Sequence, residues 1–414
     1  MQYGLIGERL GHSFSKVVHG YLADYDYELC ELSREALDAF MKARDFKAIN
    51  VTIPYKGDVI PYLSYIDPEA ERIGAVNTVV NRDGRLHGYN TDFYGMSALI
   101  ERLGLVLSGK KVVILGTGGT SRTANAVAEA LGSREIVKVS RTAKDGAVDY
   151  QTLYEQHADA EILINTTPVG MYPNPDASPA ELARLPMLEG VVDAIYNPLR
   201  TKLVLEARAR GIAAEGGLYM LIAQAVRACE IFLDKKFDAD TCARVFDAIA
   251  AEKENLVLVG MPASGKSTVG RLLAEALDRR FYDMDTCIEA RAGKSIPEIF
   301  ANEGEVAFRD LETQVLKEEL AQRNGLVIAT GGGAILRDEN VEALRQNGRL
   351  YFLDRPLKDL IPTSDRPLAS SVEAIRRRYE ERYDRYCAVA DLRVDGGGTP
   401  EEVAESVRKD FVRK

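Results

Sequence analysis

The chain has 414 residues, of which 46% are hydrophobic and 28% charged, and its 53 Lys and Arg against 63 Asp and Glu give a net charge of −10. At about 150 residues per domain, this length predicts two or three domains. The negative balance argues against a general binder of nucleic acid and favours small-molecule ligands held by local positive charge. No apolar run approaches the ~18 residues that a membrane span needs, so we expect no membrane segment.

The N-terminus and the cysteines indicate the cellular compartment of the protein. Glu8 and Arg9 interrupt the only apolar stretch at the N-terminus, so we expect no signal peptide. The five cysteines are odd in number and never occur in C-x-x-C spacing. This pattern favours reduced thiols in a cytoplasmic enzyme over a disulfide framework or a zinc site.

Two segments have the order strand, glycine loop, helix; their strands cover 111–116 and 255–260. Short β-branched runs alternate with helical patterns elsewhere, at 162–165, 191–194, 326–329 and 350–353. This alternation predicts an α/β protein with parallel sheets covered by helices on both faces. Each glycine loop should begin its own nucleotide-binding sheet, which predicts a boundary near residues 251–254.

Three polar clusters lie upstream of the first glycine loop, at residues 12–15, 50–56 and 88–92. They read His-Ser-Phe-Ser, Asn-Val-Thr-Ile-Pro-Tyr-Lys and Gly-Tyr-Asn-Thr-Asp. Any one of these clusters alone is more often loop chemistry than catalysis, so their interpretation depends on the motifs that follow.

The first glycine loop, Gly116-Thr117-Gly118-Gly119, follows a buried strand and opens a helix. This is the context of a dinucleotide-binding turn, in which backbone N–H groups at the helix N-terminus bind a pyrophosphate. Ser121 stands at the third position of the G-x-G-x-x-G fingerprint, and a loop of this kind can also be a plain turn.

The next strand, 136–139, is followed by Ser140, Arg141, Thr142 and Lys144. An NAD site would carry an acidic residue at this strand end. A guanidinium and two hydroxyls suit the ribose 2′-phosphate of NADP instead. An exposed polar turn is the alternative interpretation.

With all these motifs in order, the first ~250 residues resemble shikimate dehydrogenase. The family is marked by H-S-x-S, N-V-T-x-P-x-K, V-N-T, N-T-D, G-x-G-G and an N-R-T-like turn. It continues with Y-x-P-x-x-T and G-x-x-M-L-x-x-Q, which are here Tyr196, Pro198, Thr201, Gly217, Met220, Leu221 and Gln224. The resemblance implies a substrate lobe beside a Rossmann NADP lobe, and reversible reduction of 3-dehydroshikimate to shikimate with NADPH.

The resemblance also implies roles for particular residues. Lys56 and Asp92 would be the catalytic pair, because reduction of a ketone needs a proton at the developing alkoxide. Substrate would be held by Ser13, Ser15, Thr52, Asn77, Asp92, Tyr196 and Gln224. NADP would be held by Gly116, Thr117, Gly118, Gly119, Thr120, Ser140, Arg141, Thr142, Lys144 and Gly217.

Four positions depart from the family pattern. Lys16 replaces Pro, Gly20 replaces Asn, Tyr219 replaces Gly before the Gln224 helix, and Asp145 replaces a basic residue after Lys144. Tyr219 bears on the wall of the nicotinamide site, and Asp145 bears on NADP affinity. None of the four touches the implied catalytic pair.

The second glycine loop, residues 260–268, matches G-x-x-x-x-G-K-[ST] between a strand and a helix. Backbone N–H groups of such a loop cradle phosphates, its lysine reaches the β and γ groups, and its serine hydroxyl faces Mg²⁺. The loop therefore predicts a bound nucleoside triphosphate without identifying the phosphoryl acceptor. The residues predicted to hold it are Ala263, Ser264, Gly265, Lys266, Ser267 and Thr268.

Further motifs follow the loop and together resemble shikimate kinase over residues 255–414. They are Asp283-x-Asp285, Phe308-Arg309-x-x-Glu312, Gly331-Gly332-Gly333, Arg366-Pro367-Leu368 and Arg382-x-x-x-Tyr386. Relative to that family, the stretch 359–365 is short, and glycines at 396–398 stand where an adenine-side loop often has Arg or Asn. The resemblance implies MgATP as donor and shikimate as acceptor.

By this resemblance Asp285 would hold the acceptor hydroxyl as base or orienter, and Asp283 would place Mg²⁺ together with Ser267. Arg309 and Arg382 would clamp the substrate carboxylate, since a guanidinium fork suits planar oxyanions. Glycines Gly331, Gly332 and Gly333 would let the backbone approach the ring. Arg366 would stabilise charge on the transferring phosphoryl group, beside Lys266.

The leading hypothesis is therefore a bifunctional enzyme of aromatic amino-acid precursor synthesis. We expect a substrate lobe at 1–100 completed by helices of about 217–253, an NADP lobe at 101–216 and a kinase domain at 255–414. Its partners would be the small molecules 3-dehydroshikimate and shikimate, and its state a monomer or homodimer. Two alternatives remain: a first half that only binds or regulates, and an altered specificity such as quinate.

Overall fold

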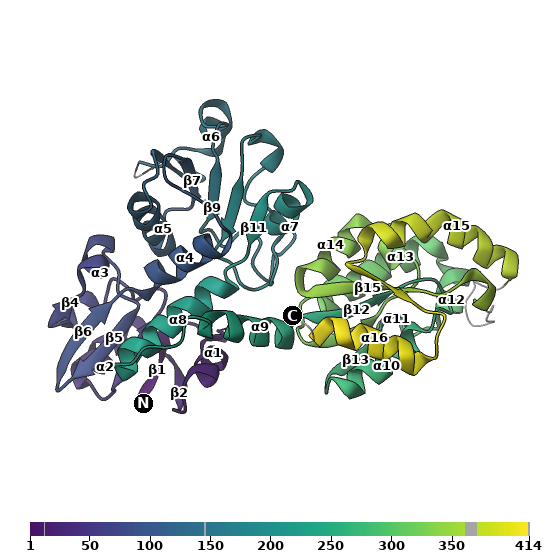
Figure 1. Cartoon of the computed structure of the whole chain (residues 1–414), viewed down its shortest axis with the longest axis horizontal. Coiled ribbons are helices and arrows are strands. Elements are labelled where there is room, and N and C mark those ends of the chain that lie inside the picture. Colours follow the sequence, from purple (N-terminus) through teal and green to yellow (C-terminus); the bar gives the residue numbers. More distant parts are fainter. Residues whose placement is uncertain (12, 145, 361–370, 413–414) are drawn as a thin grey trace. The chain divides into compact units, whose positions relative to one another are not determined.

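The computed structural model describes residues 1–11, 13–144, 146–360 and 371–412. These residues form two compact units, Met1–Ile249 and Ala250–Lys414, and the division falls within helix α9 (Thr241–Lys253) (Figure 1). Both units are α/β, so the predicted fold class is confirmed. In the part of the chain that is described, no helix is both long and apolar enough to cross a bilayer.

The first unit contains two sheets, and the one nearer the N-terminus is mixed. Its strand order is β2-β1-β3-β5-β6-β4. The strands are β1 (Tyr3–Gly7), β2 (Tyr27–Glu31), β3 (Ala48–Val51), β4 (Tyr65–Ile66), β5 (Thr78–Arg82) and β6 (Arg85–Tyr89). Strand β5 runs antiparallel to both β3 and β6, which differs from the expected parallel sheets. Asp83 and Gly84 both have positive φ and form a two-residue hairpin turn, which forces β5 and β6 to be antiparallel.

The helices of this lobe are α1 (Ser15–Leu22), α2 (Arg34–Ala43), α3 (Pro68–Ile73) and α4 (Thr91–Arg102). The chain returns to the lobe through α8 (Leu218–Leu233), whose Ala228 and Phe232 pack against Leu5 and Tyr27 of the sheet. Helices α4 and α8 also pack against each other. They bring residues that are more than a hundred positions apart in the sequence to one pocket.

The second sheet of the first unit is parallel throughout, in the order β11-β10-β9-β7-β8. Its strands are β7 (Lys111–Leu115), β8 (Glu135–Val139), β9 (Ile162–Asn165), β10 (Gly190–Asp193) and β11 (Ala213–Glu215). Helices α5 (Gly119–Ala130) and α4 cover one face, and α6 (Tyr150–Gln156) and α7 (Lys202–Ala209) cover the other. The chain reverses direction across the sheet at β7, where an open α/β sheet binds its ligand.

The second unit has a single parallel sheet in the order β13-β14-β12-β15-β16. Its strands are β12 (Asn255–Val259), β13 (Arg280–Asp283), β14 (Leu326–Ala329), β15 (Gly348–Asp354) and β16 (Leu392–Asp395). Its helices are α10 (Lys266–Ala276), α11 (Met284–Ala292), α12 (Ile296–Asn302), α13 (Gly304–Val315), α14 (Asp338–Asn347), α15 (Val372–Val389) and α16 (Pro400–Val412). A separate apolar core covers each face of the sheet. The central strand β12 leads into the second glycine loop.

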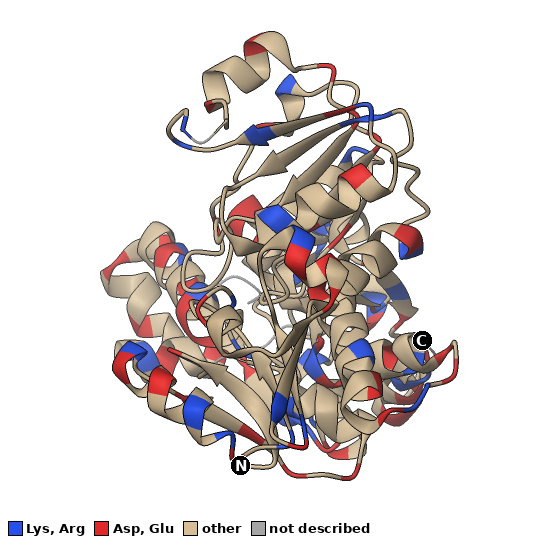
Figure 2. Cartoon of the chain, turned by 90° about the vertical axis from the view of Figure 1, so that its left-hand side faces the viewer, with Lys and Arg blue, Asp and Glu red and all other residues tan. Residues whose placement is uncertain are grey.

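The net negative charge is spread over both units. In Figure 2, basic and acidic residues are interspersed along the same helices and strands. Binding of anionic ligands therefore depends on individual basic residues at each site and not on the net charge of a unit.

Candidate active sites

A cavity of about 400 Å³ in the first unit collects the residues that the sequence predicted to bind substrate. They come from the loop before α1 and the start of α1, from the segments after β3 and β10, from the residue before β5, and from α4 and α8. The predicted residues in its lining are Ser13, Ser15, Thr52, Lys56, Asn77, Asp92, Tyr196 and Gln224, with Thr120 and Gly217 of the predicted cofactor set. Arg9 also lines this cavity and was not predicted.

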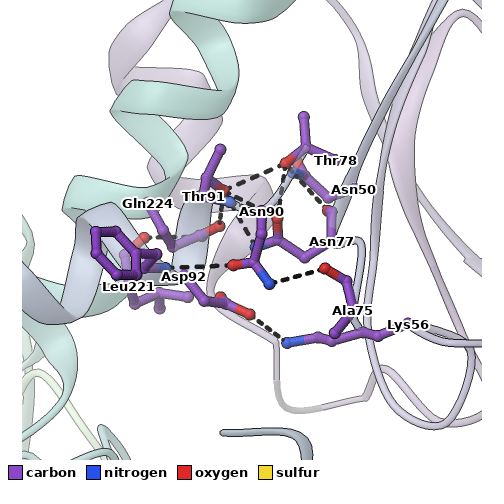
Figure 3. Close-up of polar contacts among 11 residues, drawn as sticks. Asn50, Lys56, Ala75, Asn77, Thr78, Asn90, Thr91, Asp92, Leu221 and Gln224 are labelled. Carbon is purple, nitrogen blue, oxygen red and sulfur yellow. Dashed lines mark hydrogen bonds and ion pairs between the residues drawn. The ribbon is translucent and has the colours of Figure 1, made fainter. Parts of the chain in front are cut away.

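Lys56 and Asp92 form an ion pair, with Lys56 Nζ 2.6 Å from Asp92 Oδ2 (Figure 3). Their side chains are 18% and 13% exposed, so solvent screens the pair less than it would a surface pair. Asp92 lies in the first turn of α4, which is capped by Asn90. The Asn90 side chain accepts from the N–H of Phe93 at 3.2 Å and donates to Ala75 O at 2.9 Å, which fixes this helix end.

A network of uncharged side chains lies beside the ion pair (Figure 3). The N–H of Thr91 donates to Asn77 Oδ1 at 2.7 Å, and the Thr91 hydroxyl donates to Gln224 Oε1 at 3.2 Å. Gln224 Nε2 donates to Leu221 O at 2.9 Å. Asn50 is buried behind them and donates to Thr78 Oγ1 at 3.1 Å. Strand β5, helix α4 and helix α8 are therefore held in register at the pocket by hydrogen bonds.

The dinucleotide loop after β7 has the backbone that a pyrophosphate requires. Gly116 has φ of +105°, and a Cβ there would lie 2.7 Å from Thr166 Oγ1. A Cβ at Gly118 or Gly119 would meet nothing within 4 Å, so the N-terminus of α5 is open to a ligand. Ser121 is buried and donates to Gly116 O at 2.7 Å, so the departure from the glycine fingerprint closes the loop instead of weakening it.

Ser140, Arg141, Thr142 and Lys144 follow the end of β8, and Arg141 and Lys144 are exposed. Neither cation forms an ion pair with another residue in the described ranges. A guanidinium and an ammonium in the turn after β8, unpaired with any acid of the described residues, fit the additional phosphate of NADP. Asp145 lies outside the described residues, as does His12.

Asp193, which was not predicted as a functional residue, is fully buried at the end of β10. It accepts from Thr201 Oγ1 at 2.6 Å, from Asn165 Nδ2 at 2.9 Å and from the N–H of Ile195 at 3.0 Å. Burial raises the pKa of Asp193 to about 6, and these hydrogen bonds oppose the rise. This carboxyl anchors the turn that carries Tyr196 into the cavity.

Tyr219, one of the four departures, takes part in an aromatic clamp around Arg102. The guanidinium carbon of Arg102 lies 4.6 Å from the ring centre of Tyr219 and 4.3 Å from that of Phe246. Arg102 Nε also lies 3.2 Å from a Glu215 carboxylate oxygen. The clamp joins the C-terminal end of α4, the first turn of α8 and helix α9. No local sequence motif links these residues, so sequence reasoning missed it.

The second glycine loop has the shape of a phosphate cradle. Gly260, Ala263 and Gly265 all have positive φ, and α10 begins directly after Gly265. Lys266 is 7% exposed, and its Nζ donates to Gly260 O at 2.9 Å and to Met261 O at 2.8 Å. All six residues predicted to hold the nucleotide line a cavity of about 300 Å³, together with Asp283, Asp285, Pro262, Thr330 and Gly332.

The donor set at this loop fits Mg²⁺. Ser267 Oγ donates to Asp283 Oδ2, so the predicted hydroxyl and carboxylate ligands are adjacent. No cluster of three or more His, Cys, Asp or Glu side chains placed to hold a metal occurs among the residues described. Mg²⁺ suits such a site because it commonly takes one or two protein oxygens and completes its shell with phosphates and water.

A neighbouring cavity of about 440 Å³ holds the groups predicted to bind the acceptor. Those groups are Asp285, Arg309, Gly331, Gly332, Gly333 and Arg382. Asp283, Asp285, Pro262 and Gly332 line both cavities, so the acceptor pocket adjoins the phosphate loop. This adjacency is what in-line transfer between two bound substrates requires.

Arg309 is held in this pocket by the buried carboxylate of Glu312, with Nη1 2.7 Å from Oε2. Burial raises the pKa of Glu312, and the charge of Arg309 opposes the rise. Arg382 Nη1 donates to Gly332 O at 3.2 Å. A Cβ at Gly333 would overlap the guanidinium of Arg309, so a glycine is needed there to leave room for it. Arg366 lies outside the described residues.

The fold and these sites define an α/β enzyme with two nucleotide-dependent centres, one with a dinucleotide loop and one with a Walker loop. Residues 262–411 match the family model of shikimate kinase, and residues 5–79 match that of the shikimate dehydrogenase substrate binding domain. The chain is 36% identical over 252 residues to the shikimate dehydrogenase (NADP(+)) of Clostridium beijerinckii, covering 57% of this chain and 93% of the relative.

Solved structures are similar over the same part of the chain. Shikimate dehydrogenase 1 from Peptoclostridium difficile has 35% identity and a TM-score of 0.56, covering 60% of this chain and 98% of that one. The Thermus thermophilus shikimate 5-dehydrogenase in complex with NADP(H) and shikimate has 30% identity and a TM-score of 0.54, covering 60% and 99%. The chain belongs to the shikimate dehydrogenase family and has a shikimate kinase domain at its C-terminus, which confirms both resemblances.

Proposed function

We propose that this chain is a bifunctional shikimate-pathway enzyme. It reduces 3-dehydroshikimate to shikimate with NADPH, then phosphorylates shikimate to shikimate 3-phosphate with MgATP. Family membership and the C-terminal kinase domain support the two activities. The observation that carries the proposal is the Lys56–Asp92 ion pair inside a cavity that also contains Thr120 and Gly217. The product of the first reaction is the substrate of the second.

In the first unit, bound NADPH supplies the hydride, and the chain supplies binding and the proton. Lys56 donates a proton to the carbonyl oxygen as charge develops there, while Asp92 holds the ammonium in position. The hydroxyls and carboxylate of the substrate are held by Ser13, Ser15, Thr52, Asn77, Tyr196 and Gln224. Residues 116–120 and Gly217 hold NADP, and the set Ser140, Arg141, Thr142 and Lys144 holds its 2′-phosphate.

In the second unit, bound MgATP supplies the phosphoryl group. Backbone N–H groups of 263–268 and Lys266 hold the phosphates, and Ser267 and Asp283 hold Mg²⁺. Asp285 orients the acceptor hydroxyl and takes its proton, while Arg309 and Arg382 hold the substrate carboxylate. We assign Arg366 to stabilise charge on the transferring group.

The proposed organisation follows from these roles. Residues 1–100 with helices of 217–253 form the substrate lobe, 101–216 the NADP lobe and 255–414 the kinase domain. We place the chain in the cytoplasm, as a monomer or homodimer acting on small molecules. All five cysteines are free thiols, which supports a reducing compartment.

A one-pot assay tests the proposal. The purified chain, supplied with 3-dehydroshikimate, NADPH and MgATP, should oxidise NADPH and accumulate shikimate 3-phosphate. Absence of that product would refute the proposal, and binding of NADPH without turnover would reduce the first unit to a binding module. Comparing kcat/KM for shikimate and quinate, each with NADP and NAD, checks the specificity.

A further inference from the structure

Arg355 lies directly after β15, in a segment that runs along the phosphate loop. A Cβ on Gly260, the first glycine of the loop, would lie 2.9 Å from Leu353 O. A Cβ on Gly265, the last glycine, would lie 3.8 Å from Arg355 Nη1. The guanidinium therefore lies next to Gly265, the residue directly before α10, at the end of the loop where phosphates bind. None of the motifs recognised in the sequence includes Arg355.

One contact of its side chain and one of its backbone fix the position of Arg355. Its Nε donates to Asp359 O at 3.2 Å, which fixes the side-chain stem. A Cβ on Gly396 would lie 3.0 Å from the backbone N of Arg355 and 3.1 Å from its Cα, so a larger residue at 396 would displace it. Within the described ranges, Arg355 forms no ion pair with a carboxylate. No carboxylate of the described residues therefore neutralises its charge.

The phosphate cavity needs such a charge. The ionisable side chains that line it are Lys266, Asp283 and Asp285, whose charges of +1, −1 and −1 sum to −1. MgATP carries a net charge of about −2, so this lining alone would oppose its entry. Lys266 is also engaged with two backbone carbonyls of the loop.

We propose that Arg355 is a second cation of the nucleotide site, whose guanidinium contacts the phosphates held by loop 260–268. The proposal rests on the proposed kinase function. A guanidinium fork matches the spacing of phosphate oxygens and stays charged at every physiological pH. Arg355 thereby supplies positive charge next to the glycine stretch 396–398, which carries none.

The test compares Arg355→Met and Arg355→Lys with a control, Lys358→Met, in the full chain. Lys358 is an exposed cation three residues away, so its removal changes the net charge equally without removing a group from the loop. Affinities for ADP, adenosine and shikimate are measured by calorimetry or competition. Arg355→Met should weaken ADP binding about 10- to 100-fold, the size of a lost charge-assisted contact, and Arg355→Lys should weaken it less. Adenosine and shikimate should bind as in the wild type.

Three results would overturn the proposal: unchanged ADP affinity in Arg355→Met, an equal loss for adenosine, or an equal loss in Lys358→Met. The second result would place Arg355 against the adenine base instead of the phosphates. The third would mean that Arg355 acts only through the overall positive charge of the unit. Because shikimate binds both units, denaturant unfolding of the second unit reports whether it is folded. A loss of stability in both Arg355→Met and Arg355→Lys would assign the residue to folding and would also overturn the proposal. A wild-type chain that binds ADP but forms no shikimate 3-phosphate would refute the kinase function instead.

Discussion

The two units use charge in opposite ways. The cavity of the first unit surrounds one ion pair, Lys56–Asp92, with amides and hydroxyls such as Asn77 and Gln224. The second unit packs buried or half-buried ions close together, including Lys266, Arg309 with Glu312, and two aspartates. Reduction of a ketone develops charge at one oxygen, so a single proton donor suffices. Phosphoryl transfer moves a group with several charged oxygens, so many opposing charges must be placed around it.

The largest effects are expected from removing one lysine from each unit. Lys56→Ala should lower dehydrogenase kcat by about 10²- to 10⁴-fold, because the proton donor is lost. Lys266→Ala should lower kinase kcat/KM by a similar factor, because the phosphates lose their buried cation. Each variant serves as the control for the other when both activities are assayed on the same preparation. A variant that loses both activities would contradict the separation of the two sites.

Removing Arg309, the cation beside Glu312, tests how much the free energy of unfolding of the second unit depends on this buried ion pair. Arg309→Met should lower the free energy of unfolding of this unit by about 3–5 kcal/mol, because the buried Glu312 carboxylate loses its partner. The double variant Arg309→Met with Glu312→Gln should regain part of that loss. Denaturant unfolding of the three proteins measures it. A double variant as unstable as the single one would show that Glu312 does not depend on Arg309.

Asp193 is a buried acid of the first unit, and its titration makes the stability of that unit depend on pH. The unfolded chain loses this proton near pH 3.8, whereas the folded unit retains it up to about pH 6. The unfolded state therefore binds fewer protons across this interval, and stability falls as pH rises from about 4 to about 6, by about 3 kcal/mol in all.

The substitution Asp193→Asn should flatten this pH dependence, because the amide cannot ionise, while Thr201 and Asn165 keep a hydrogen-bonding partner. Unfolding free energies of the wild type and variant between pH 4 and 7 measure the difference. A slope that persists unchanged in Asp193→Asn would assign the pH dependence to other groups.

The aromatic clamp predicts a smaller effect that should be confined to the first unit. Phe246→Ala removes one of the two rings around Arg102 and should raise the KM for NADPH about 2- to 5-fold, because the turn at Gly216 and Gly217 is less firmly held. Phe246→Tyr should behave as wild type, since it retains the ring. Kinase activity of the same preparations is the internal control. An unchanged KM in Phe246→Ala would show that the clamp does not support the cofactor wall.

Much of the fold could be predicted because glycine loops and short apolar strands are local signals. The strands before Gly116 and Gly260 and the helices after them are where the pattern predicts them. The antiparallel β5–β6 hairpin was missed, although Asp83-Gly84 is a hairpin signal that sequence reasoning could have used. Ser121 was interpreted as an imperfect match, and only its hydrogen bond to Gly116 O shows why a serine serves there.

The sequence by itself determined the family and the two activities, and it predicted residues that line each cavity, because these depend on short motifs with local backbone requirements. The tertiary structure decided which groups touch. Lys56 and Asp92 are 36 positions apart, Thr91 and Gln224 are 133 apart, and Arg355 reaches a loop about ninety residues before it. Such contacts, and the burial that raises the pKa of Asp193, arise only when distant segments pack together. The family resemblance implied the pairing of Lys56 with Asp92, whereas the contacts of Arg355 and Asp193 leave no local motif in the chain.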